Sequence, residues 1–198
     1  ALEDPMSRER LLREARAASA LNHTGIVTIH EVGSAEGIDF IAMELVEGED
    51  LLKLLRRRHR LPLREAAHLV AGVARALQPA HAMGVYHRDL TPDNVILTER
   101  AKGGFKLRLI DFGVARASFL AGMTATGMLM GTPEYMAPEQ IRGGAVDART
   151  DVYALGAVAY FALCGRPPFT GETPIAIGFA QLQEPPRPPR ALRPEVPP

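Results

Sequence analysis

Two short acidic segments near the middle of the chain hold the side chains best suited to chemistry. The first contains Asp89 and Asn94, and the second contains Asp111. Two apolar runs, 95–98 and 107–110, lie between these segments, and the Gly-Gly pair between the runs predicts a turn that joins two strands. Such a hairpin would bring the three oxygen-bearing side chains together at one end. Oxygens grouped in this way suit Mg²⁺ and a phosphate better than a packed core.

Three short motifs follow one another in an order that is specific, although each motif is weak alone. His87-Arg88-Asp89 comes first, Asp111-Phe112-Gly113 second, and Ala137-Pro138-Glu139 third. On these motifs the sequence resembles the bacterial, eukaryotic-like (Hanks-type) serine/threonine protein kinases over essentially the whole chain. The resemblance implies an α+β, protein-kinase-like fold and phosphoryl transfer from ATP, with Mg²⁺, to a Ser or Thr of a protein substrate.

The resemblance gives each polar residue of the acidic segments a catalytic role. Asp89 would accept the proton of the substrate hydroxyl and orient it for attack on the γ-phosphate. Asn94 and Asp111 would hold Mg²⁺, whose charge neutralises the phosphate oxygens. His87 and Phe112 would stack and place the two loops. Without the surrounding motifs, Asp89 and Asp111 fit ordinary turn residues or helix caps better than catalytic residues.

Five positions would surround the nucleotide if the resemblance holds. Met43 would be the gatekeeper, and Glu44 and Val46 would offer hinge backbone groups to adenine. Ile96 would lie beneath the adenine ring, and Glu14 would pair with the ATP-binding lysine. Taken alone, Glu14 also fits a solvated charge with i,i+4 partners, and Met43 also fits an ordinary core position.

The stretch 114–130 contains small residues, Gly and Thr, without periodicity, which predicts a loop. By resemblance it is the activation loop. Thr124 and Thr126 would be phosphorylated there, and Arg88 would bind the added phosphate. A loop whose hydroxyls have no such role is equally compatible with the sequence.

Two further threonines, Thr132 and Thr91, inform the expected acceptor residue and the expected rate of phosphate transfer. The run 131–139 resembles the substrate-docking loop of kinases that act on Ser or Thr, and it would place Thr132 near Asp89. Most serine/threonine kinases have Lys two residues after the catalytic Asp, whereas this chain has Thr91. Loss of that cation removes stabilisation of developing charge, so weakened activity is the expectation.

The pattern of apolar residues predicts the main elements. A helix is expected over 6–21, two strands over 26–32 and 40–45 joined by a loop at 33–37, and a longer helix that opens at 61–63. A buried core helix opens at Asp151. That carboxylate either caps the helix or, as the resemblance implies, reaches back to the backbone of the catalytic loop.

These elements divide the chain into three expected parts. Residues 1–48 would form a partial N-lobe with helix αC, two strands and the hinge. Residues 49–184 would form the helical C-lobe with the catalytic and activation loops. Residues 185–198 are rich in Pro and Arg, and we expect an extended tail without a core of its own.

Composition gives little indication of particular partners. The 198 residues include 23 Lys and Arg and 23 Asp and Glu, so net charge gives no indication of nucleic acid or an anionic membrane as partner. The single Cys164 cannot form an internal disulfide, which favours a reducing compartment. No signal peptide or spanning helix is evident, so a cytoplasmic location is expected, with any membrane anchor outside this chain.

The sequence contains no Gly-x-Gly-x-x-Gly loop, and no Val-Ala-x-Lys strand precedes Glu14. We therefore expect an incomplete kinase domain, truncated at both ends, whose isolated chain is impaired in ATP binding. The alternative is a pseudokinase or scaffold that binds partners without catalysis. A metal-dependent hydrolase that uses His87, Asp89 and Asp111 is a distant third hypothesis, since no second His lies at ligand spacing.

Overall fold

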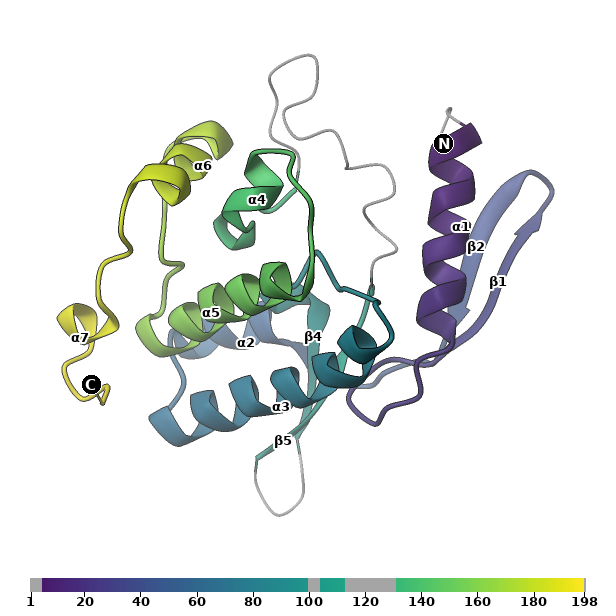
Figure 1. Ribbon diagram of the computed structural model, residues 1–198. Helices are drawn as coiled ribbons and strands as arrows, with labels where there is room; N and C mark the ends of the chain where they lie inside the picture. The colour runs from purple at the N-terminus through teal and green to yellow at the C-terminus, as the bar shows by residue number, and fades with distance from the viewer. Residues whose placement is uncertain (1–4, 100–103, 113–130, 198) are drawn as a thin grey trace.

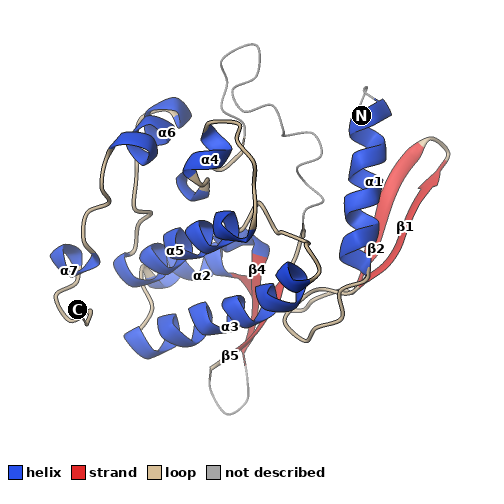
Figure 2. Ribbon diagram, viewed as in Figure 1, coloured by secondary structure: helices blue, strands red, loops and turns tan. Residues whose placement is uncertain are grey.

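The computed structural model describes residues 5–99, 104–112 and 131–197 and shows a mixed α+β chain in two unequal parts (Figure 1). The smaller part is one helix beside a two-stranded sheet. The larger part consists of helices packed around a three-stranded sheet (Figure 2). The α+β class expected from the sequence is thus confirmed.

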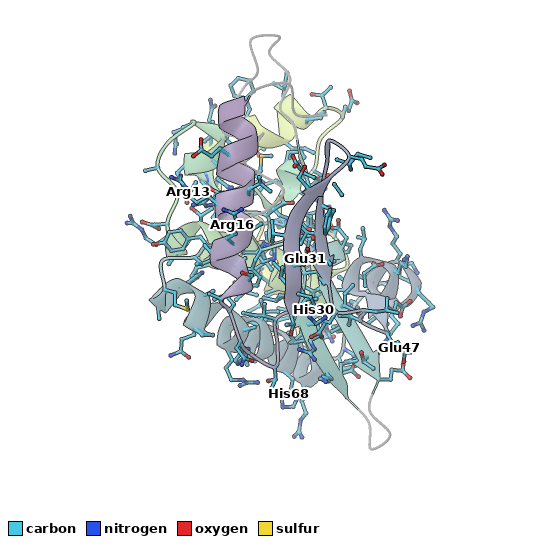
Figure 3. The ribbon with its side chains drawn as sticks, turned by 90° about the vertical axis from the view of Figure 1, so that its right-hand side faces the viewer. Arg13, Arg16, His30, Glu31, Glu47 and His68 are labelled. Atoms are coloured by element: carbon cyan, nitrogen blue, oxygen red, sulfur yellow. The ribbon has the colours of Figure 1, made fainter. Side chains whose placement is uncertain are left out.

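The smaller part contains three elements, namely α1 (Pro5–Ser19), β1 (Ile29–Ala35) and β2 (Ile38–Met43). Buried Ala15 and Ala18 form the inward side of α1. Arg13 and Arg16 are exposed and lie on its outer face, next to the exposed His30 and Glu31 of β1 (Figure 3). The helix predicted over 6–21 is confirmed, with its observed end at Ser19.

The hairpin of β1 and β2 turns later than predicted. Its antiparallel register runs from the pair Ile29 and Met43 to the pair Ala35 and Ile38. Glu36 and Gly37 form the turn with φ values of 51° and 78°, the left-handed pair that favours tight hairpins. The loop predicted over 33–37 was too long. Gly33 lies within β1, where the ring of Phe40 on the paired strand occupies the space that a Cβ would need.

The three-stranded sheet contains β3 (Glu49–Asp50), β4 (Val95–Glu99) and β5 (Phe105–Leu109), all antiparallel. Val95 opposes Leu109, and both are fully buried. The predicted hairpin of 95–98 and 107–110 is confirmed, although Ile110 lies beyond the strand. The Leu109 backbone also joins the two parts of the molecule, because it accepts from the Val27 N–H at 2.9 Å and donates to the Gly25 carbonyl at 2.8 Å.

The helices of the larger part are α2 (Leu51–Arg58), α3 (Leu63–Ala82), α4 (Pro138–Ile141), α5 (Ala148–Cys164), α6 (Pro174–Gln183) and α7 (Pro189–Leu192). The core lies where α2, α3 and α5 meet the sheet, around buried Leu51, Val73, Val95 and Val158. Short 3₁₀ helices η1 (Pro92–Asn94) and η3 (Pro133–Tyr135) lie beside this core.

Helix α5 begins before the position predicted for it. Its N-cap is Asp147, whose carboxylate accepts the Arg149 N–H at 2.8 Å. Asp151 is therefore not a cap, and the capping role considered for it is wrong. The helix ends at Gly165 with a φ of 77°, the left-handed conformation that glycine adopts at helix C-termini. Starting α5 at Ala148 instead places Asp151 one turn inside the helix, with its side chain buried.

The C-terminal segment is anchored rather than only extended. Helix α7 gives it one helical turn, and Arg193 beyond that turn is only 7% exposed. The Arg193 guanidinium donates to the Leu61 carbonyl at 2.7 Å and to the Leu163 carbonyl at 3.1 Å, which satisfies carbonyls beside the start of α3 and the end of α5. Composition did not predict this contact, because it joins residues 132 positions apart.

Among the helices that the structure describes, none combines the length and the apolar character needed to cross a membrane.

Candidate active site

A buried carboxylate fixes the backbone of the loop that begins at His87. Asp151 is fully buried, and its Oδ2 accepts the His87 N–H at 2.8 Å while its Oδ1 accepts the Arg88 N–H at 2.7 Å. His81, near the end of α3, places Nε2 2.7 Å from the same Oδ2. Arg88 has a φ of 63°, a conformation that these contacts stabilise against its intrinsic cost. The expected reach of Asp151 to this loop is confirmed.

Asn94 joins the two acidic segments. Its side-chain amide donates to the Asp89 carbonyl at 2.8 Å, and its own carbonyl accepts the Ile110 N–H at 3.1 Å. Asp111 follows Ile110 directly and has a φ of 59°, which turns the chain at the end of the hairpin. The structure therefore brings the segments that carry Asp89, Asn94 and Asp111 to the same end of the hairpin.

His87 and Phe112 pack between these segments. Their ring centroids lie 4.7 Å apart at an interplanar angle of 50°, and His87 Nε2 lies 3.0 Å from the Ile110 carbonyl. Burial lowers the pKa of His87, although neighbouring carboxylates, first Asp151, oppose that shift. The imidazole is therefore neutral near pH 7, with Nε2 as the donor to the carbonyl. The predicted contact between the two rings is confirmed.

In the absence of a bound cation, the surroundings of Asp111 disfavour its ionised form. Burial raises the pKa of the Asp111 carboxyl, and the negative charges of Asp89 and Asp93 raise it further, while His87 acts in the opposite direction. A bound cation would relieve this repulsion and favour the ionised carboxylate. Only the part of the shift that comes from Asp89 and Asp93 would be relieved in this way, because the largest cause of the shift is burial.

The donor set of the site fits a hard divalent cation. In the described residues no cluster of three or more His, Cys, Asp or Glu could hold a metal by itself. Asn94 and Asp111 offer an amide and a carboxylate oxygen, and the Asn94 Nδ2 is already committed to the Asp89 carbonyl, so Oδ1 faces away from that bond. One or two such oxygens suit Mg²⁺ when substrate phosphates and waters supply the remaining ligands.

The segment after β2 has free backbone groups of the right kinds for a nucleobase. Glu44 donates its N–H to the Thr28 carbonyl at 2.9 Å. Among the described residues, no N–H of the chain donates to the Glu44 carbonyl and no carbonyl accepts the Val46 N–H. A carbonyl and an N–H two residues apart can bind, respectively, the donor and the adjacent acceptor of a base edge.

Met43 and Ile96, the two side chains expected around a base, differ in exposure, and Met43 is 38% exposed. Met43 lines a small cavity of about 20 Å³ together with Asp111 and Phe112, so the end of β2 lies close to the second acidic segment. Ile96 of β4 is half-buried. Gly48 has a φ of 154°, and a Cβ there would lie 2.6 Å from the Leu97 carbonyl, so only glycine allows the chain to pass so near β4.

Glu14 and Arg88 form an ion pair between α1 and the catalytic loop. Arg88 Nη1 lies 2.5 Å from Glu14 Oε1, and both side chains are largely shielded from solvent. The Arg88 carbonyl also accepts the side-chain amide of Gln140 at 2.8 Å. The structure therefore gives Glu14 an arginine partner that the sequence did not suggest. A phosphate bound at Arg88 would have to compete with this carboxylate.

Thr132 and Asp89 line one small pocket of about 10 Å³, as expected, together with Thr91 and Gln140. Thr91 is 2% exposed, and its Oγ1 makes no hydrogen bond within the described residues. A buried methyl-bearing side chain at this position cannot supply the charge of a lysine. Thr124 and Thr126 lie outside the described residues.

Sequence reasoning missed three residues that shape the site, namely His81, Arg108 and Gln140. Arg108 forms an ion pair with Glu44 at 3.0 Å. Gln140 accepts the Ala137 N–H and donates to the Arg88 carbonyl, so it links the motif at 137–139 to the catalytic loop. His81 and Arg108 lie on a helix and a strand with no local signal of their partners, whereas the position of Gln140 directly after that motif could have indicated it.

Comparison with known proteins agrees with this geometry. The model of the protein kinase domain matches residues 2–190. The chain is 42% identical to serine/threonine-protein kinase PknA of Mycobacterium tuberculosis over 98% of its own length and 45% of that protein. It is 39% identical to a probable serine/threonine-protein kinase PknB of Corynebacterium glutamicum over 94% of its length and 29% of that protein. A probable serine/threonine-protein kinase of Streptomyces coelicolor is 37% identical over 98% of the chain and 29% of that protein.

The chain spans less than half the length of these curated relatives. The match nevertheless covers the catalytic loop, the Asp-Phe-Gly segment and helix α5. The chain therefore belongs to the protein kinase domain family and is similar throughout to bacterial serine/threonine-protein kinases.

Proposed function

We propose that this chain is the catalytic part of an enzyme that transfers the γ-phosphoryl group of ATP, with Mg²⁺, to a Ser or Thr hydroxyl of a protein. The observation that carries the proposal is the link through Asn94, which binds the Asp89 carbonyl and accepts from the Ile110 N–H. A general base and a metal-binding carboxylate are thereby held at one end of one hairpin.

Asp89 is the general base of the proposed reaction. It lines the same pocket as Thr132 of the substrate-docking loop, where an acceptor hydroxyl would approach. Its carboxylate accepts the hydroxyl proton and orients the oxygen in line with the γ-phosphate. The loop backbone stays fixed during this step because Asp151 holds the N–H groups of His87 and Arg88.

Asn94 Oδ1 and the Asp111 carboxylate are the proposed metal ligands. Bound Mg²⁺ would neutralise charge on the phosphate oxygens as it develops. The raised pKa of Asp111 supports this assignment, because the repulsion from Asp89 and Asp93 that contributes to it is what a cation relieves. Phe112 and His87 keep this carboxylate at the mouth of the hairpin through their ring contact.

The hinge is the proposed nucleotide-binding edge. The Glu44 carbonyl would accept the exocyclic amino group of adenine, and the Val46 N–H would donate to a ring nitrogen. Met43 would close the back of this site, and Ile96 would support the base from below. Residues 1–48 then act as part of the N-lobe, and 49–184 as the C-lobe.

The sequence as printed contains no glycine-rich phosphate loop and no lysine strand before Glu14. We propose that the isolated chain binds ATP poorly for this reason. A scaffold that binds partners without catalysis is the second candidate, and buried Thr91 in place of a lysine is the observation that favours it. Asp89, Asn94 and Asp111 together favour catalysis, since a scaffold has no use for all three.

The test measures phosphate transfer from labelled ATP to a Ser/Thr peptide by the protein expressed from its complete gene. Asp89→Asn should lower kcat by about 100-fold or more, the range for loss of a general base, with a small change in the KM for ATP. Glu172→Gln is the control, because this carboxylate is exposed and lies outside the catalytic loop. Equal activity of Asp89→Asn and the wild type, or no transfer by the wild type, would reject the proposal.

A further inference from the structure

Just beyond the paired ends of β1 and β2, the Glu44 side chain takes the place of its own backbone carbonyl in pairing with Thr28. The Glu44 N–H donates to the Thr28 carbonyl at 2.9 Å, and the Thr28 N–H donates to Glu44 Oε2 at 3.3 Å. Residues that pair in this way in an antiparallel sheet normally exchange both bonds through their backbones. Because the carboxylate takes the second bond, the Glu44 carbonyl stays outside the ladder.

Arg108, which lies on β5 of the other sheet, holds that carboxylate. Its Nη2 lies 3.0 Å from Glu44 Oε1, and its Nη1 donates to the Ile26 carbonyl at 3.0 Å. The Arg108 and Glu44 side chains are 18% and 23% exposed, so solvent screens the pair only in part. A planar guanidinium suits this bridge because it directs two donors at fixed angles, which an ammonium cannot do.

The hydrogen bond from Thr28 and the nearby positive charges favour the ionised form of the Glu44 side chain. The pKa of Glu44 is lowered, first by the hydrogen bond from Thr28; burial opposes this shift, and the positive charges of Arg108 and Lys106 add smaller lowering effects. The carboxylate therefore stays ionised near neutral pH and accepts from both partners.

Arg108 also lies on the face of the sheet that would meet the nucleotide. It stands directly opposite Ile96 in the register of β4 and β5. Directly opposed residues in an antiparallel pair project from the same face. Arg108 is thus next to the proposed adenine floor and, through Glu44, connected to the proposed adenine edge, without contacting the base itself.

We propose that Arg108 is a positioning residue for the nucleotide, which acts through the Glu44 carboxylate to keep the Glu44 carbonyl free and directed at the amino group of a purine. This inference rests on the proposed function. It assigns adenine selectivity to the pair, because the 6-oxo group of guanine presents an acceptor to a carbonyl that is itself an acceptor, whereas adenine presents a donor.

The experiment uses the protein expressed from its complete gene and measures kcat and KM for ATP and for GTP. Arg108→Gln should raise the KM for ATP by roughly two- to tenfold, the size of one weakened hydrogen bond, with kcat little changed. The preference for ATP over GTP should fall by a similar factor. Lys106→Gln is the matched control, because it removes a charge from the same strand that acts on Glu44 without contacting it.

Two further variants separate positioning from simple loss of structure. Arg108→Lys keeps the positive charge but loses the planar guanidinium, so it should give an intermediate KM for ATP. It also serves as a variant that should still fold if Arg108→Gln does not. Glu44→Gln combined with Arg108→Gln should be no worse than either change alone, because both act on one hydrogen-bonded unit.

The outcomes distinguish this inference from the proposed function. No transfer by the wild type would overturn both. A wild type that transfers phosphate, with variants that melt earlier but keep the KM for ATP and the preference over GTP, would overturn the positioning role alone. An equal rise in KM for Lys106→Gln would also overturn it, because net charge would then account for the effect.

Discussion

Two carboxylates in this molecule do the same chemical task in different surroundings. Asp151 accepts the N–H groups of His87 and Arg88, and Glu44 accepts the N–H of Thr28. Asp151 is fully buried under the catalytic loop, whereas the Glu44 side chain is 23% exposed at the hinge. Each carboxylate holds a backbone that local hydrogen bonding would not hold by itself.

Because Asp151 is buried and Glu44 is partly exposed, we expect the two carboxylates to control different properties of the protein. A buried acceptor with hydrogen-bonded partners fixes one arrangement, because any departure leaves polar groups without water or partners. A partly exposed acceptor can exchange a protein donor for water at small cost. We therefore expect changes at Asp151 to affect the rate and the stability, and changes at Glu44 and Arg108 to affect mainly nucleotide binding.

The largest effect should come from Asp151→Ala, which leaves two buried N–H groups and His81 without their acceptor. The free energy of unfolding should fall by about 3–5 kcal/mol, as for other broken buried networks, and kcat should fall with it. Urea denaturation and initial rates would measure the two quantities. Asp151→Asn, which keeps one acceptor oxygen, should lie between the wild type and Asp151→Ala.

Asp147 provides the matched control on the same helix. Its carboxylate caps α5, and its ion pair with Arg149 is largely exposed. Asp147→Ala should cost about 1 kcal/mol, the usual value for an N-cap, and leave kcat unchanged. A comparable loss of rate for both variants would break the distinction between a catalytic anchor and an ordinary stabilising contact.

Contacts between residues close in the chain could be predicted from the sequence, whereas contacts between distant residues could not. The hairpin of β4 and β5, and with it the meeting of Asp111 and Asn94, follows from apolar runs and a turn that are close in the chain. The His81 to Asp151 contact spans 70 positions and the Glu14 to Arg88 pair spans 74. Such pairs depend on how α1, α3 and α5 pack, which no local pattern specifies.

Two predicted element boundaries were wrong because contacts with other parts of the chain determine them. The turn at Glu36 and Gly37 was missed because Gly33 resembles a loop residue until the Phe40 ring is placed over it. The start of α5 was missed because only Asp151 was considered as its cap, although Asp147 is a residue type that also caps helices. Burial of one and exposure of the other, which follow from packing against the catalytic loop, make the choice.

An intermediate effect should appear in the pH dependence of stability through His87. Burial lowers its folded pKa below the ordinary value of 6.5, so at acid pH the unfolded chain binds a proton that the folded chain does not. Stability should therefore fall as pH decreases below about 6.5, with a slope of at most about 1.4 kcal/mol per pH unit from this residue. Denaturation curves between pH 7.5 and pH 5 would measure that slope.

His87→Gln keeps a donor for the Ile110 carbonyl but cannot titrate in this range. Its stability should be lower at every pH and change less with pH than that of the wild type. His68→Gln is the control, because this histidine is exposed on α3 (Figure 3). Equal slopes for His87→Gln and the wild type would show that other groups set the acid sensitivity of the buried region.

The smallest effect on stability should come from Arg88→Gln, which removes the ion pair with Glu14. The two side chains are largely shielded but keep 21% and 15% exposure, so water can replace part of the lost contact and the cost should be about 1 kcal/mol. Its functional effect should be larger, because Arg88 is the proposed receptor for phosphate on Thr124 or Thr126. The ratio of activity before and after phosphatase treatment should approach one in Arg88→Gln and stay higher in the control Arg64→Gln, an exposed arginine of α3. A ratio that is unchanged in Arg88→Gln would mean that Arg88 serves the link to α1 and not the phosphate.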